Sequence, residues 1–241
     1  MSQNHRITVM TYNVHGCLGL DRRRSPDRIA RVIGGIKPDV VALQEIDMRM
    51  ARSGKVDQAQ RIAGLLGMKS HFYATVEDGG GLYGGAVLSR FPLRKVKANL
   101  LPAVGPFEPR GALWVEVDCG GRPMQVVNTH LGLRRQERAR QVQTLLSQGW
   151  CRHPRFRGPA VLCGDFNMTR RAKPYRAIAE LMPDARSRAP RSGRRGTWLG
   201  IAHLDHIFTT PDVTVHAVDV SVTPKSGLAS DHFPLYAQLS V

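Results

Sequence analysis

Six apolar, strand-length runs in this chain border on side chains that can carry out chemistry. The run from Ala160 to Cys163 leads into Gly164-Asp165-Phe166-Asn167, and Ser230-Asp231-His232 stands just before the run from Pro234 to Leu239. A carboxylate beside a polar group at the end of a buried strand places charged chemistry at the rim of a sheet. The six groups are Asn13, Glu45, Asn128-Thr129-His130, Asp165 with Asn167, Asp205, and Asp231-His232.

Strand-length and helix-length segments alternate along the chain, separated by turns rich in Gly and Pro. The first helix is expected to begin at Ser25-Pro26-Asp27 and to stop at Pro38, because Ser25 can cap free amides and proline is tolerated at the first helical position. Further helices are expected near 59–66, 135–148 and 174–181. Strands are expected near 7–12, 39–43, 70–74, 85–89, 94–100, 112–117, 124–129, 160–163, 204–208, 213–220 and 234–239.

The order of these elements predicts the fold class. Both halves of the chain run strand, helix, strand, with further strands between, which indicates two packed mixed sheets with helices outside, an α/β four-layer sandwich. A chain of 241 residues with 42% hydrophobic side chains can bury one large core, so residues 1–241 are expected to form a single domain. Strand ends from both halves would then meet along one edge.

Three of the residues at this edge suit a hard divalent ion. Mg²⁺ prefers one or two carboxylates with retained waters to a full protein cage. Glu45 follows an apolar strand, and together with Asn13 and Asp231 it is the expected ligand of Mg²⁺ or Mn²⁺. Taken alone, Glu45 is better explained as a solvated strand end.

The remaining residues suit the hydrolysis of a phosphodiester, which needs an oriented water and relief of negative charge. Asp165 can align the water or accept its proton, and Asn167 can hold that water or a phosphoryl oxygen. His232 can bind the developing charge as an imidazolium whose tautomer Asp205 fixes. His130 offers a second phosphate donor. The alternative for both histidines is a purely structural role as polar strand ends.

The charge of the chain indicates anionic partners. Lys and Arg number 35 against 19 acidic residues, a net charge of +16, and both nucleic acid and an anionic membrane or phospholipid surface would answer it. The alternative is that arginine merely fills solvated surface positions. No secretory h-region and no membrane span of about 18 apolar residues is present, so a cytoplasmic location is expected.

The polar strings also resemble the motifs of a known family. Thr11-Tyr12-Asn13-Val14-His15-Gly16, Leu43-Gln44-Glu45, Asn128-Thr129-His130-Leu131, Gly164-Asp165-Phe166-Asn167, Leu204-Asp205-His206-Ile207-Phe208 and Ser230-Asp231-His232 occur in the order typical of the endonuclease/exonuclease/phosphatase superfamily. The resemblance implies a deoxyribonuclease-like fold, a Mg²⁺ or Mn²⁺ cofactor and a monomer. It also implies metal contacts for Asn13, Glu45 and Asp231, water activation by Asp165, orientation by Asn167, and an Asp205–His232 pair at the scissile phosphate.

Departures from the family pattern bear on the substrate. Abasic-site endonucleases of the family usually have tyrosine where this chain has His130, and deoxyribonucleases pair that histidine with an acidic residue that the segment 82–90 lacks. His206 replaces the basic or tyrosine residue found in inositol phosphatases and tyrosyl-DNA phosphodiesterases. The chain is most similar to small stand-alone bacterial members.

Substrate contacts are expected from two places. Arg110 stands at a strand start, where its guanidinium could fork onto phosphate oxygens or pair with a surface carboxylate. Five arginines, at 186, 188, 191, 194 and 195, crowd the segment before Trp198, and of these Arg194 and Arg195 are expected to contact substrate with Trp198. Such a segment suits nucleic acid or an anionic lipid surface, or is simply a solvated loop.

Three classes of function therefore stay open. The first is a metal-dependent phosphodiesterase acting on an anionic phosphoester. The second narrows this to a nucleic-acid endonuclease or exonuclease, or to a phospholipid or sphingomyelin-type phosphodiesterase. The third, a non-catalytic anion-binding module, is disfavoured because Glu45, His130, Asp165, Asn167, Asp205 and His232 are all present.

Overall fold

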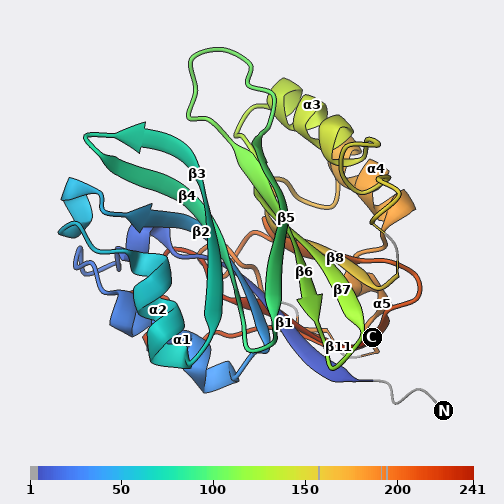
Figure 1. Ribbon diagram of the computed structural model, residues 1–241, viewed down its shortest axis with the longest axis horizontal. Helices are drawn as coiled ribbons and strands as arrows, with labels where there is room; N and C mark the ends of the chain where they lie inside the picture. Colours follow the sequence, from blue (N-terminus) through green and yellow to red (C-terminus); the bar gives the residue numbers. More distant parts are fainter. Residues whose placement is uncertain (1–4, 157, 191, 194) are drawn as a thin grey trace.

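A six-stranded mixed sheet forms one half of the molecule (Figure 1). The computed structural model describes residues 5–156, 158–190, 192–193 and 195–241. The strand order in this sheet is β10-β11-β1-β2-β4-β3. The strands span β1 (Arg6–Asn13), β2 (Val40–Met48), β3 (Lys69–Asp78), β4 (Gly81–Ser89), β10 (Thr214–Val220) and β11 (Leu235–Ser240).

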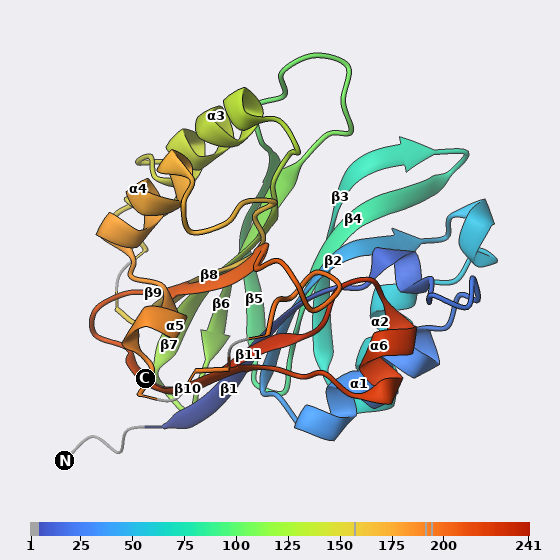
Figure 2. The same ribbon diagram turned by 180° about the vertical axis from the view of Figure 1, so that it is seen from behind.

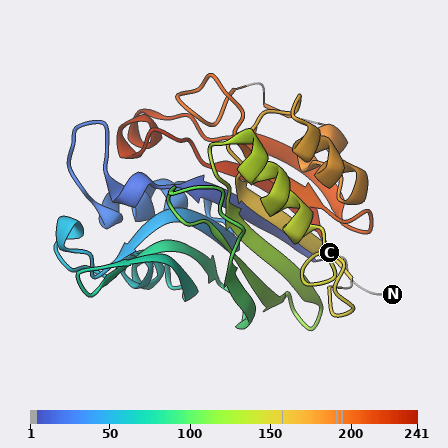
Figure 3. The ribbon, with the colours of Figure 1, turned by 90° about the horizontal axis from the view of Figure 1, so that it is seen from above.

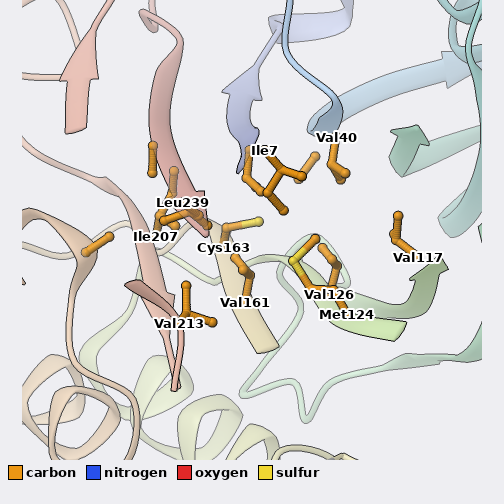
Figure 4. Close-up of a cluster of buried hydrophobic side chains, with 14 of the residues drawn as sticks. Ile7, Val40, Val117, Met124, Val126, Val161, Cys163, Ile207, Val213 and Leu239 are labelled. Atoms are coloured by element: carbon orange, nitrogen blue, oxygen red, sulfur yellow. The ribbon is translucent and has the colours of Figure 1, made fainter. Parts of the chain in front are cut away.

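A five-stranded mixed sheet forms the other half, in the order β5-β6-β7-β8-β9. Its strands span β5 (Leu93–Leu100), β6 (Gly111–Asp118), β7 (Pro123–His130), β8 (Ala160–Asp165) and β9 (Asp205–Thr209). A central apolar layer joins the two sheets, and Figure 4 shows Ile7 and Val40 of the first sheet facing Val126 and Val161 of the second. Burial of these side chains supplies the main driving force for packing the sheets together.

Helices cover the outer face of each sheet, as Figures 1 and 2 show. On the six-stranded sheet, α1 (Pro26–Ile36) and α2 (Gln58–Leu66) bury Ile33 and Ile62 against it. On the five-stranded sheet, α3 (Arg135–Leu145) and α4 (Lys173–Leu181) bury Val142 and Ile178. The four-layer α/β sandwich expected from the sequence is thus confirmed.

Each sheet contains one parallel pair of strands made by a helical crossover. β1 and β2 run parallel and are connected through α1, while β7 and β8 run parallel and are connected through α3. All other named pairs are antiparallel. The carboxyl ends of a parallel pair lie at the same edge of the sheet, so this topology delivers the ends of β1, β2, β7 and β8 to one edge of the sandwich.

The predicted element boundaries are close to those observed, with a few differences. Ser25 caps α1 as expected, its Oγ accepting from the Arg28 amide at 3.2 Å. The third helix was expected to reach residue 148 but ends at Leu145, because the chain turns there and the Trp150 amide donates to the Ser147 carbonyl.

Four short helical segments were missed because they offer too few residues for a periodic pattern. They are the 3₁₀ helices η1 (His15–Cys17) and η2 (Ala51–Ser53) and the α-helices α5 (Ala185–Arg188) and α6 (Pro224–Ala229). Among the helices of the described ranges, none combines the length and apolar character that crossing a bilayer requires.

A polar bridge ties the two sheets together just behind the edge where the parallel strands end. Asn128 of β7 is fully buried, and its Nδ2 donates to the carbonyls of Leu43 at 2.9 Å and Ala86 at 3.0 Å, on β2 and β4 of the opposite sheet. Its Oδ1 accepts from Gln44 Nε2 at 2.7 Å. The bridge satisfies buried polar groups that would otherwise oppose close packing of the sheets.

Replacing Asn128 with alanine should therefore destabilise the fold. Asn128→Ala removes three buried hydrogen bonds and leaves their partners unsatisfied, so the free energy of unfolding should fall by about 3 kcal/mol in urea titrations. The matched control is Asn99→Ala on the exposed strand β5, which should change it by no more than about 0.5 kcal/mol. Equal effects of the two substitutions would contradict this role for the bridge.

Candidate active site

Both sheets contribute to a hydrogen-bonded group of side chains at this edge. Asn13 ends β1 in one sheet, and its Nδ2 donates to Asp165 Oδ2 at 3.0 Å and to Glu45 Oε1 at 2.9 Å. Asp165 ends β8 in the other sheet, where it pairs in register with His130 at the end of β7. One amide therefore joins the two carboxylates that the sequence assigned to separate roles.

The backbone around Asp165 is shaped to hold its carboxylate. Gly164 has φ +148°, and a Cβ at this position would lie 1.9 Å from the Thr129 carbonyl oxygen, so only glycine lets β8 lie this close to β7. Asn167 has φ +49°, and its backbone N–H donates to Asp165 Oδ1 at 2.9 Å. The Gly-Asp-x-Asn string thus has a structural as well as a chemical reason.

Glu45 is presented by a break in the pairing of β2. The register with β4 shifts between Gln44 and Ile46, and Glu45 lies in this bulge with φ +57°. A positive φ at a glutamate is uncommon and costs energy, which places this residue among the strained positions that collect at functional sites. Within the described residues its carboxylate has a single hydrogen-bond partner, Asn13.

A row of alternating charges crosses the centre of the site. Asp205, at the start of β9, accepts from His232 Nδ1 through Oδ2 at 2.8 Å. His232 Nε2 lies 3.6 Å from Asp165 Oδ2. All three residues are buried, and Asp205 Oδ1 has no partner among the described residues. The Asp205 bond fixes the ring so that Nε2 faces Asp165. The sequence had suggested the Asp205–His232 pair but not the approach of the ring to Asp165.

This row shifts the protonation of its members. Burial and the nearby Asp205 raise the pKa of Asp165 to about 7. Burial opposes protonation of His232, but Asp205 and Asp165 outweigh it and raise its pKa to about 10. Near neutral pH the ring is therefore an imidazolium, and Asp165 is poised between its two protonation states.

His130 lies on the other side of Asp165. Its Nε2 is 3.6 Å from Asp165 Oδ2, and Asn167 Nδ2 lies 3.1 Å from the same nitrogen. Burial and the neighbouring Arg110 and His232 depress the pKa of His130 well below its ordinary value, so the ring is neutral. A neutral ring cannot lend positive charge to a phosphate, which limits His130 to hydrogen bonding.

Arg110 reaches this site by way of His130. One of its guanidinium nitrogens, NH1, lies 3.0 Å from His130 Nδ1 and also contacts Glu108. A guanidinium can only donate, so this contact favours Nδ1 as the acceptor. The Asn167 side-chain nitrogen is also a donor and faces Nε2, so the two contacts favour opposite tautomers of the neutral ring. Of the two alternatives raised by the sequence, the ion pair with a carboxylate is present, as Arg110 bonds Glu108, and contact with a substrate phosphate stays a prediction.

Asp231 is bound by a residue that sequence reasoning did not select. Its Oδ1 lies 3.2 Å from His15 Nδ1, and the adjacent Ser230 Oγ donates to the Asn13 carbonyl at 2.9 Å. Burial opposes ionisation of Asp231, but the His15 bond and nearby His232 lower its pKa overall. His15 sits in the Asn-x-His string already noted, and its spacing of two residues from Asn13 was the available signal.

The arginine-rich segment differs from its expected form. Arg186 and Arg188 belong to α5 and not to a solvated loop, and Arg188 donates to the Thr209 hydroxyl and the Thr210 carbonyl at 2.9 and 2.8 Å. Arg186 likewise bonds the Gly193 carbonyl, so both arginines form hydrogen bonds within the protein itself. Arg191 and Arg194 lie outside the described residues.

Trp198 and Arg195 stay candidates for substrate contact. Trp198 is 38% exposed and forms an isolated bridge with His232, which places it beside the charged row. Arg195 is exposed. His206, which departs from the family pattern, is buried and structural, because its Nε2 bonds the Met168 carbonyl at 2.9 Å and its Nδ1 faces Asp184 at 3.3 Å.

Two sets of donors could hold a metal ion. Ligand atoms of Asp165, Asp205 and His232 lie within 4.8 Å of one another, but His232 is protonated and already bonds Asp205, so it is a poor ligand as it stands. Asn13, Glu45 and Asp231 offer oxygen atoms, which suit a hard ion such as Mg²⁺. The second set is the better fit, because Glu45 has a strained backbone conformation and its carboxylate accepts a single hydrogen bond among the described residues.

The fold and its edge site define a class of two-sheet α/β sandwich proteins with carboxylates and imidazoles gathered where the strands of both sheets end. Within that class, the chain belongs to the Endonuclease/Exonuclease/phosphatase family, whose model matches residues 10–232. Members of this family are typically hydrolases acting on phosphoester bonds. No curated protein matches the chain in sequence.

Solved structures share the fold over nearly the whole chain. The endonuclease/exonuclease/phosphatase from Bacteroides vulgatus superposes with a TM-score of 0.79 at 21% identity, covering 97% of this chain and 98% of that one. The mannosyl-6-phosphatase Bt3783 of Bacteroides thetaiotaomicron gives 0.73 at 19% identity, covering 97% and 99%. The human nocturnin catalytic domain with bound sulfate gives 0.73 at 23% identity, covering 100% and 95%. At these identities the likeness establishes the fold.

The raised pKa of Asp165 predicts a pH-dependent stability penalty. Its pKa is about 7 in the folded protein against an ordinary value of 3.8, so between these values the folded state holds more protons than the unfolded state. Stability must then fall as pH rises through this window. Asp165→Asn removes the titration, so wild type should lose stability relative to this variant as pH rises from about 5 to 7, in urea titrations with chelator.

The exposed Asp212 provides the control for this comparison. Asp212→Asn should follow wild type at every pH, because the side chain is exposed and lies outside the candidate site. A difference between wild type and Asp165→Asn that stays constant, or that moves in favour of wild type as pH rises, would contradict the assigned environment of Asp165.

Proposed function

We propose that this protein is a divalent-metal-dependent phosphodiesterase that hydrolyses its substrate with a water activated by Asp165. The observation that carries the proposal is the position of Asp165 Oδ2. It lies 3.0 Å from Asn13 Nδ2 and 3.6 Å from the Nε2 atoms of both His130 and His232, in a buried edge built by both sheets. A carboxylate with a pKa of about 7 in this setting is suited to act as a general base at neutral pH.

In the proposed reaction, Asp165 takes a proton from the attacking water while the water oxygen bonds to phosphorus. The bond from phosphorus to the ester oxygen breaks, and the leaving oxygen takes a proton from solvent. Asn167 follows Asp165 by two residues and lies within hydrogen-bond range of His130, so its amide can orient this water or a phosphoryl oxygen. Holding water, base and phosphate in one geometry is a large part of what such a site contributes to rate.

His232 is placed to stabilise the negative charge that develops on the phosphoryl oxygens. Its Nε2–H faces the site, and Asp205 keeps the ring protonated and fixed in orientation. Donors fixed in place before the reaction stabilise the transition state without reorganisation at the moment of bond breaking. His130, kept neutral by burial and by Arg110 and His232, supplies a second imidazole beside Asp165 that can form a hydrogen bond.

Asn13, Glu45 and Asp231 are the residues that would hold Mg²⁺ or Mn²⁺. When bound there, the ion supplies Lewis-acid stabilisation of negative charge on phosphate oxygens. Without the ion, the Asn13 side-chain amide donates to the carboxylates of both Glu45 and Asp165 and so holds the two groups next to each other. The identity of the ion, the cytoplasmic location and the monomeric state expected from the sequence stay predictions.

Two further observations bear on the kind of phosphoester that the protein hydrolyses. The mannosyl-6-phosphatase among the similar structures supports a phosphomonoesterase as a second candidate, and the sulfate bound by the nocturnin domain is a tetrahedral anion of the kind a phosphoesterase site takes. The net charge of +16 favours a polyanionic substrate such as nucleic acid, or an anionic phospholipid, over a small phosphoester that carries little negative charge. A non-catalytic anion-binding role leaves the row Asp205–His232–Asp165 without a purpose.

Hydrolysis of bis-(p-nitrophenyl) phosphate, with p-nitrophenyl phosphate as the monoester comparison, tests the proposal. Activity should require Mg²⁺ or Mn²⁺ and should be lost with chelator. Asp165→Asn and Glu45→Gln should each lower kcat by at least about 10²-fold, because they remove the base and an ion ligand. Asp212→Asn should match wild type. Full activity in both site variants would refute the mechanism, and activity confined to the monoester would favour the second candidate.

A further inference from the structure

A groove lined by cations begins at the active site and runs between α3 and α4. Figures 1, 2 and 3 show the two helices side by side on the outer face of the five-stranded sheet. Between their first turns lies a cavity of about 800 Å³ whose lining includes Asn167, the residue that contacts His130. The chemistry-bearing edge and this cavity therefore share a wall.

A second cavity extends the groove away from the site. It has a volume of about 580 Å³ and shares Ala139, Lys173 and Pro174 with the first, so the two form one continuous channel along the helix pair. Because both cavities are open to solvent along the seam of the helices, an extended ligand could lie in them with one end at Asn167.

The walls of this channel are cationic, most strongly in the cavity beside the active site. The lining contains six cations and no Asp or Glu: Arg135, Arg138, Arg171, Lys173 and Arg176 line the first cavity, and Arg152 joins Lys173 in the second. Among the described residues none of the six forms an ion pair, whereas arginines such as Arg28, Arg52 and Arg61 elsewhere do. Unneutralised cations lining one concave surface raise the local potential and attract an anion that can approach several of them at once.

Resting on the proposed function, we infer that this groove, here called the α3–α4 groove, binds the backbone of a single-stranded polynucleotide whose scissile phosphate lies at Asp165. Several regularly spaced phosphates match cations distributed along a channel better than one small phosphate does. Helices that pack at about 8–10 Å between axes leave only a narrow seam on their outer surface, which suits one extended strand better than a duplex.

The composition of the groove also predicts how it reads its ligand. Its lining holds no Phe, Tyr or Trp, so bases have no stacking platform there, and contact is expected with phosphates only. Binding should therefore be independent of base sequence and strongly dependent on salt. Sequence reasoning missed this feature because the cations come from α3, from α4 and from the turns beside them, and α3 and α4 lie too far apart in the sequence to form a compact motif.

The test is the binding of fluorescein-labelled oligothymidylate and oligodeoxyadenylate, followed by anisotropy in chelator so that no cleavage occurs. The triple variant Arg171→Gln, Lys173→Gln, Arg176→Gln should weaken binding of both oligonucleotides about tenfold or more near 0.1 M salt. The slope of log K against log salt should fall by about 2, at about 0.7 for each lost phosphate contact. The control replaces the exposed cations Arg31, Lys69 and Lys95, outside the groove, with glutamine and should stay within about twofold of wild type.

Steady-state rates then separate this inference from the proposed function. For the groove variant, kcat/KM for the oligonucleotide should fall at least tenfold more than kcat/KM for bis-(p-nitrophenyl) phosphate, which has no flanking phosphates. Equal losses of oligonucleotide binding in both triple variants, or none in either, would overturn the groove. The groove would also be overturned if tripolyphosphate displaced the oligonucleotide as well as unlabelled oligonucleotide does at the same phosphate concentration. A third contrary result is that the groove variant loses binding to phosphatidylserine vesicles but keeps its binding to oligonucleotides. Absence of small-diester hydrolysis in wild type would instead count against the proposed function.

Discussion

The hydrogen bonds from Asn13 to Asp165 and Glu45 are the interaction on which the site depends. They join the end of β1 in one sheet to the end of β8 in the other, at the edge where both parallel pairs terminate. Just behind them, Asn128 makes the second polar link between the sheets. The packing of two sheets thus sets the distance between the groups that would hold an ion and the group that would activate water.

Burial of Asp165 at this junction has a cost that its neighbours offset only in part. Asp165 would resist ionisation in a buried edge, but the imidazolium of His232 and the Asn13 amide lie beside it. His232 in turn stays protonated because Asp205 and Asp165 flank it. Such groups favour function over stability, since each is harder to bury than an apolar side chain of the same size.

The sequence predicted most of this arrangement because local patterns determine it. Apolar runs with polar ends identified the strands that carry Asp165 and His130, and the fold class followed from the order of strands and helices. Other features depend on tertiary contacts that no local pattern reports. The bulge that presents Glu45, the pairing of His15 with Asp231 and the folding of Arg188 back onto the Thr210 carbonyl are of this kind.

Protonation of His232 is the most direct measure of the charged row at the centre of this account. Two-dimensional ¹H–¹⁵N spectra of the imidazole rings, assigned with His232→Gln and recorded in chelator, report the charge and tautomer of each ring as pH is raised. The structure predicts that His232 remains an imidazolium at pH 8, since Asp205 and Asp165 raise its pKa to about 10. A His232 ring that loses its proton at a pH near 6.5, the ordinary pKa of histidine, or below would show that Asp205 and Asp165 do not stabilise the imidazolium.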